Sequence, residues 1–102
     1  MTTKKKYGSR DLDERLGKLT VGEFVHTWRK ANGMNLKDFG ELAGISVGNL
    51  CDIEKGRRLV SPERAAQFAK VMGYSAAQFI GTAIEDQLRQ AGLRFSVELK
   101  AA

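Results

Sequence analysis

Apolar residues recur every three or four positions between Thr20 and Gly92, a spacing typical of helices with one buried face. Glycines and potential capping residues interrupt the pattern at several points, which predicts a set of short helices rather than one long helix. We expect five helices, at residues 20–33, 36–43, 47–55, 62–72 and 75–92. The predicted fold class is all-α.

Side chains suited to helix starts stand at these boundaries. Thr20 and Glu23 have the spacing of a capping box, in which each side chain bonds the other residue's backbone amide. Ser75 and Gln78 repeat this spacing, and Pro62 suits a first helical turn because no helical bond needs its missing amide hydrogen. The side chains expected to face the core are Val21, Val25, Trp28, Phe39, Leu42, Ala43, Leu50, Ile53, Ala65, Phe68, Ala69, Met72, Phe79, Ile80, Ala83, Ile84 and Leu88.

After Gly92 the period of the apolar residues changes from 3.6 to 2. Leu93, Phe95, Val97 and Leu99 alternate with polar residues, which predicts a strand within residues 92–102. A lone strand leaves its backbone amides and carbonyls unpaired, and the simplest partner is the same strand of a second copy. The pattern therefore predicts a homodimer, with an unstructured tail as the alternative.

Residues 1–19 form a charge-dense tail, with a possible short helix from Ser9, ahead of a domain expected at residues 20–91. The whole chain has a formal net charge of +5, and residues 1–61 hold twelve basic and eight acidic side chains. This excess suits a polyanionic partner. Lys4, Lys5 and Lys6 are candidates for an arm that enters a DNA groove, or alternatively for a tail that only increases solubility.

Several classes of protein are excluded or made improbable by composition. One cysteine and one histidine provide neither an internal disulfide nor a zinc site with the usual four ligands, so we expect no metal. Phosphate-binding glycine loops, paired catalytic carboxylates and nucleophile motifs are absent from the sequence, so we expect no cofactor and no enzyme activity. No apolar stretch is long enough to span a membrane and no secretory signal is present, so the expected compartment is the cytoplasm.

Residues 33–56 carry the most specific pattern, a short helix, the tight turn Ala43-Gly44-Ile45-Ser46 and a second short helix. Together with Ser61-Pro62-Glu63 and Gly73-Tyr74-Ser75, this stretch resembles the phage Cro-repressor-like (XRE-type) helix-turn-helix family over about residues 20–80. The resemblance implies a five-helix domain that binds double-stranded DNA. Three departures stand out: Leu36 replaces a frequent glutamine, Gly40 replaces the usual alanine, and the loop before Ser61 is longer than in some members.

The second helix of this pair is expected to present Val47, Gly48, Asn49 and Asp52 to the bases in the major groove. Asparagine can bond an adenine edge in two places, aspartate can accept from the cytosine amino group, and valine can contact the thymine methyl. Flanking groups suit phosphate contacts, unless they form only a solvated surface. These groups are Lys37, Ser46, Lys55, Arg57 and Arg58.

The remaining conspicuous residues are given structural roles. The resemblance implies that Arg29 and Glu54 pair to join the first and third predicted helices. Cys51 follows the inward-facing Leu50 and is interpreted as a packing residue, with a redox switch as the alternative. His26 lies off the apolar stripe and is assigned no chemistry.

These features predict a sequence-specific transcriptional regulator, a repressor, that binds a roughly palindromic operator as a dimer. One alternative is an antitoxin that represses its own operon and also binds a toxin. Another is an adaptor that uses the same fold to bind protein without contacting DNA bases.

Overall fold

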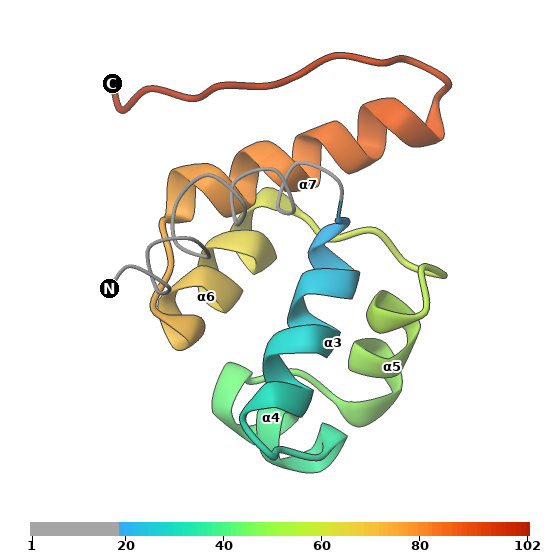
Figure 1. Cartoon of the computed structure of the whole chain (residues 1–102), viewed down its shortest axis with the longest axis vertical. Coiled ribbons are helices and arrows are strands. Elements are labelled where there is room, and N and C mark those ends of the chain that lie inside the picture. The colour runs from blue at the N-terminus through green and yellow to red at the C-terminus, as the bar shows by residue number, and fades with distance from the viewer. Residues whose placement is uncertain (1–18) are drawn as a thin grey trace, which may run out of the picture.

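The computed structural model describes residues 19–102, and the helices of this part surround one core (Figure 1). The expected helices are confirmed, with ends that differ by no more than two residues from the predicted ones. They are α3 (Val21–Ala31), α4 (Leu36–Ala43), α5 (Val47–Glu54), α6 (Pro62–Met72) and α7 (Ala76–Gln90). No helix within the described range is long and apolar enough to cross a membrane.

Side-chain caps begin each of these helices, as the sequence indicates. The capping box of Thr20 and Glu23 is complete, with both backbone amides bonded to the opposite side chain. At the start of α7 only half of the predicted box forms, because Ser75 accepts from the amide of Gln78 without a reciprocal bond. Gly44 ends α4 in the left-handed conformation, which glycine adopts without the steric cost that other residues incur.

Aromatic rings form two groups within the core. Phe24 contacts Tyr74 and Phe79, with ring centroids 5.3 and 5.2 Å away. Phe39 lies between Trp28 and Phe68, at 5.9 and 5.8 Å. Rings at these separations and tilts add stabilisation beyond the area that they bury.

One residue expected in the core lies outside it. Leu42 is 52% exposed, whereas the adjacent Ala43 is buried. The short α4 turns only a narrow stripe inward, and Phe39, Gly40 and Ala43 already occupy that stripe.

Two glycines allow backbones to approach closely around α5. A Cβ on Gly22 of α3 would overlap the carbonyl oxygen of Ile53 near the end of α5. A Cβ on Gly40 would lie 2.7 Å from the carbonyl oxygen of Ile45 in the turn before α5. Both glycines therefore set how closely α5 is seated on the domain.

The C-terminal segment does not form the predicted strand within one chain. Residues 93–102 contain no regular secondary structure and turn back along α7 (Figure 1). The amide of Val97 donates to Glu85 Oε2 over 2.7 Å. Because a strand requires a paired backbone, and the expected pair lies in a second copy, strand pairing and dimerisation stay predictions.

Candidate nucleic-acid interface

Helices α4 and α5 are joined by a turn of three residues that fixes their crossing. The turn residue Ile45 is buried, and its amide donates to the carbonyl oxygen of Gly40 over 2.9 Å. Leu50 and Ile53 attach α5 to the core, where both are buried. The opposite side of α5 is therefore left facing solvent.

The first turn of α5 presents most of the residues expected at bases. Val47 is 45% exposed, and Gly48 is open, because no atom of residues 19–102 would lie within 4 Å of a Cβ at this position. Asn49 is partly buried, and its backbone amide donates to Ser46 Oγ over 3.2 Å. This bond uses only the backbone amide of Asn49. Within residues 19–102 its side-chain amide makes no hydrogen bond, so it is available to a ligand.

The structure joins one expected base contact to one expected phosphate contact. Nε and Nη2 of Arg57 each lie 3.0 Å from Oδ1 of Asp52. The amide of Arg57 also donates to the Asp52 carbonyl over 2.8 Å, so the loop after α5 folds back onto the helix. In this arrangement the guanidinium neutralises a carboxylate that would otherwise repel phosphate.

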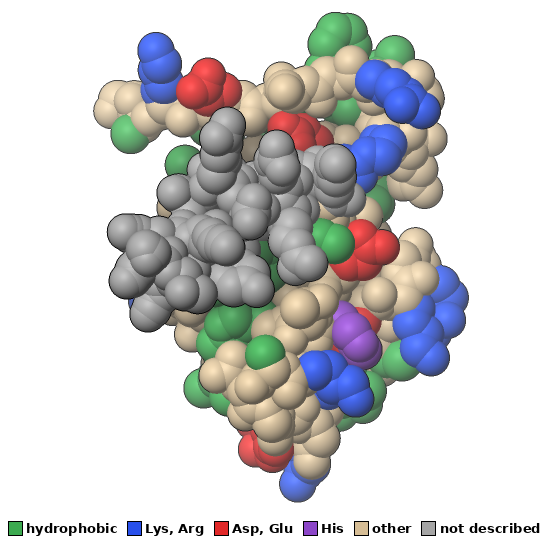
Figure 2. Space-filling view, viewed as in Figure 1, with side chains coloured by type: hydrophobic (Ala, Val, Ile, Leu, Met, Phe, Trp, Pro, Cys, Tyr) green, Lys and Arg blue, Asp and Glu red, His purple; other side chains and the backbone are tan. Residues whose placement is uncertain are grey.

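The other expected phosphate contacts flank α5 on the surface. Nζ of Lys37 lies 3.8 Å from Oε2 of Glu41, and both side chains are exposed. Such an ion pair is weak, so the lysine is free to contact a phosphate instead. Ser46, Lys55 and Arg58 are exposed. Figure 2 shows Lys and Arg side chains gathered over the α5 side of the molecule. Lys4, Lys5 and Lys6 lie outside the described residues.

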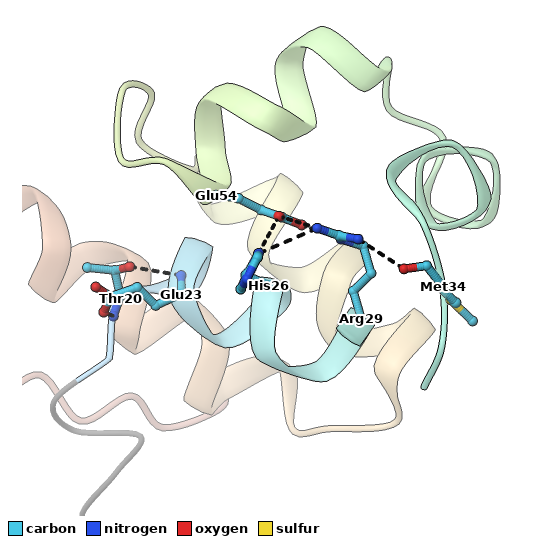
Figure 3. Close-up of polar contacts among 6 residues, drawn as sticks. All are labelled: Thr20, Glu23, His26, Arg29, Met34 and Glu54. Atoms are coloured by element: carbon cyan, nitrogen blue, oxygen red, sulfur yellow. Dashed lines mark hydrogen bonds and ion pairs between the residues drawn. The ribbon is translucent and has the colours of Figure 1, made fainter. Parts of the chain in front are cut away.

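A partly buried ionic network joins α3 to the end of α5 (Figure 3). Arg29 donates to both carboxylate oxygens of Glu54, each over 2.8 Å, and to the carbonyl of Met34 over 2.9 Å. The Nδ1 atom of His26 lies 2.8 Å from Oε1 of the same carboxylate. Arg29 therefore connects α3 to α5 and to the loop before α4.

This network shifts the pKa values of both main partners. The hydrogen bond to Glu54 raises the pKa of Arg29, which keeps the guanidinium charged. Burial raises the pKa of Glu54, but the hydrogen bonds from Arg29 and His26 outweigh burial and leave the pKa below its ordinary value. The carboxylate is therefore ionised at neutral pH.

Two further polar residues support this region and were not singled out in the sequence. Asp86 of α7 is buried, and its Oδ2 accepts from the amide of Val21 at the start of α3 over 3.0 Å. Burial raises the pKa of Asp86 despite that hydrogen bond. Nη1 of Arg64 in α6 lies 3.4 Å from the carbonyl oxygen of Gly44 in the turn. Asp86 follows Ala83 by three positions and therefore lies on the apolar stripe of α7. This position in the sequence indicates that the carboxylate is buried.

Within residues 19–102, no group of three metal-ligating side chains is present. The free Cys51 is partly buried on α5, next to the anchoring Leu50.

Two short helices, α4 and α5, joined by a three-residue turn, with α5 anchored on one side and open on the other, define a helix-turn-helix domain. A family model described as helix-turn-helix matches residues 25–79, which is more than half of the chain. The chain belongs to the XRE-type helix-turn-helix family and is a DNA-binding regulator of that type. No curated protein and no solved structure matches the chain.

Proposed function

We propose that the protein is a transcriptional repressor that binds a roughly palindromic operator as a homodimer. The observation that carries this proposal is the open first turn of α5, backed by buried Leu50 and Ile53 and flanked by exposed cations. A helix held in this way can enter the major groove with its N-terminal residues against base edges. Two copies would present their α5 helices to successive major grooves, about 34 Å apart.

In this complex Val47, Gly48, Asn49 and Asp52 face the bases. The backbone of the operator is bound by Lys37, Ser46, Lys55, Arg57 and Arg58. Of these residues Asn49 gives the sharpest base preference, because its amide can donate to and accept from one adenine edge. Glycine at position 48 contributes only space for close approach.

Asn49→Ala is expected to weaken binding to the cognate operator by about 1–3 kcal/mol and to leave binding to random duplex nearly unchanged. Arg58→Ala is the matched control, because loss of a phosphate contact weakens both kinds of binding and lowers the salt dependence. Bound sequences selected from random duplexes supply the operator, and fluorescence anisotropy measures both affinities. An equal loss by Asn49→Ala on cognate and random DNA would remove this residue from base recognition.

Deletion of residues 93–102 is expected to leave a folded monomer, because we assign the dimer contact to this segment. Sedimentation equilibrium measures the mass, and circular dichroism checks that the helices of residues 19–92 persist. The truncated chain should bind a half-site with the affinity of one subunit and lose the extra affinity of the full palindrome. A dimer of unchanged stability would place the interface on another surface.

Two other functions have one supporting observation each. Exposed Leu93 and Phe95 form an apolar surface that suits a protein partner, as an antitoxin requires. The engagement of Arg57 by Asp52 reduces the free positive charge beside α5, as an adaptor without base contacts would tolerate. Copurification of a small toxic protein would favour the antitoxin, and failure to enrich any DNA sequence would favour the adaptor.

A further inference from the structure

The C-terminal segment has one backbone edge that is already in contact with α7. The amide of Val97 donates to Glu85 Oε2 over 2.7 Å. The carbonyl oxygen of Val97 lies on the same side, 3.3 Å from where a Cβ of Gly81 would be. In an extended segment, the N–H and C=O of one residue point to one edge and those of the next residue point to the other.

The opposite edge therefore belongs to the even-numbered residues Arg94, Ser96 and Glu98. Within residues 19–102, no hydrogen bond to the backbone of these three residues is present. Their side chains are all exposed. This edge is free to pair with another extended backbone, whereas the edge of Val97 is occupied by α7.

Charge selects how two such edges would align. An antiparallel pair centred on Ser96 places Arg94 of each copy opposite Glu98 of the other. A pair centred on Val97 would instead place Arg94 opposite Lys100, and one centred on Glu98 would place two carboxylates face to face. Only the alignment on Ser96 gives two attractive pairs and no repulsive one.

The same alignment also matches the apolar side chains. It places Leu93 opposite Leu99 and Phe95 opposite Val97, twice in each dimer. In the single chain Phe95 is 67% exposed and Leu93 is 47% exposed, so this apolar surface has no cover within the described residues. Cross-strand apolar pairs of this kind stabilise a two-stranded ribbon.

We infer that the occupant of this edge is a second copy of the chain, paired antiparallel about Ser96, with α7 covering the other edge of each segment. This inference rests on the homodimer proposed above and specifies its register. The two-fold axis of this contact passes between the two Ser96 residues, so each attractive or apolar pair occurs twice. The ribbon has its apolar residues on one face and Arg94, Ser96 and Glu98 on the other.

Charge exchange on the full chain tests the register. Arg94→Glu should raise the dimer dissociation constant about 5- to 30-fold at low salt, because both attractive pairs become pairs of like charge. Glu98→Arg should do the same, and the double variant R94E/E98R should return the constant to within about threefold of the original. The matched control is Lys100→Glu, the same change of charge opposite Gly92, which should change the constant less than about twofold.

Sedimentation equilibrium without DNA measures these constants, and unchanged thermal unfolding of the helices checks each variant. Tighter association of Arg94→Glu and Lys100→Glu would overturn the register in favour of the pair centred on Val97. Single variants without effect, or a double variant that stays weak, would overturn it as well. A monomeric parent chain would refute the proposed homodimer itself, while the DNA affinities of Asn49→Ala and Arg58→Ala would still test base recognition.

Discussion

Gly22→Ala is expected to destabilise the domain by about 3 kcal/mol, at the upper end of the usual cost of overfilling a packed site. The added Cβ would overlap the carbonyl oxygen of Ile53 and would lie 2.9 Å from its carbonyl carbon. Both atoms are backbone, so no side-chain rotation relieves the overlap. Helix α5 must shift away from α3, and the bonds between Arg29 and Glu54 must lengthen or break.

Urea unfolding measures the loss, and the glycines of this domain supply graded controls. Gly40→Ala brings its Cβ to 2.7 Å from the Ile45 carbonyl oxygen and should cost less than Gly22→Ala. The Cβ of Gly48→Ala would meet no atom of the described part of the chain within 4 Å. This variant should stabilise the domain by up to about 1 kcal/mol, because alanine favours helix more than glycine does. Equal stability of the variants at positions 22 and 48 would show that α3 and α5 do not need this close approach.

The same variants separate stability from DNA binding. If α5 is displaced, Val47 and Asn49 no longer have the same position relative to the rest of the domain. The folded fraction of Gly22→Ala should therefore bind its operator more weakly. Gly40 is a second site of close approach around α5, although alanine is the usual residue at this position in the resembled family. The close contact with Ile45 explains why glycine is accommodated here despite its lower helix propensity.

The helices could be predicted because each boundary carries local information. Thr20, Ser61 and Ser75 cap helix starts, and Gly44 and Gly73 end helices in the left-handed conformation. These signals act within four residues, so a single sequence contains them. Leu42 shows the limit of this reasoning, because the width of the buried stripe of α4 depends on which helices pack against it.

Contacts between side chains in the candidate site were less accessible to prediction. The pair of Asp52 and Arg57 crosses the end of α5, and its geometry depends on how the chain leaves the helix. Asp86 contacts Val21 from 65 positions away in the sequence, which no local pattern can indicate. The resemblance to the family predicted the pair of Arg29 and Glu54. The contact of His26 with Glu54 could not be predicted, because it depends on how α3 and α5 pack together.

The paired charges also change the interpretation of the DNA surface. The sequence predicts Arg57 as one of the phosphate contacts, but in the structure Arg57 is engaged by Asp52. Binding DNA then exchanges one ionic contact of Arg57 for another, which gains less than a free cation would gain. We therefore expect Lys55 and Arg58 to contribute more to the salt dependence of binding than Arg57 does.

Glu54→Ala is expected to lower the stability at neutral pH by about 3–5 kcal/mol, because it leaves the buried Arg29 charge without its carboxylate. The side chains of Arg29 and Glu54 are only 8% and 5% exposed, so the guanidinium that loses its partner is largely shielded from water. For a domain of this size the loss corresponds to a melting temperature lower by more than about 12 °C. Glu41→Ala removes a carboxylate from an exposed pair and should leave the melting temperature almost unchanged.

The dependence on pH identifies the cause of this loss. The pKa of Glu54 in the folded chain lies below its ordinary value of 4.5, so the unfolded chain binds more protons between the two values. The stabilisation is therefore complete above about pH 4.5 and is lost as the pH falls through the folded-state pKa. Asp86 acts in the opposite direction because burial raises its pKa, but it is common to both proteins and cancels when Glu54→Ala is compared with the parent chain. Urea unfolding from pH 7 to pH 3 should show this difference shrinking, and a difference independent of pH would assign the loss to packing instead of charge.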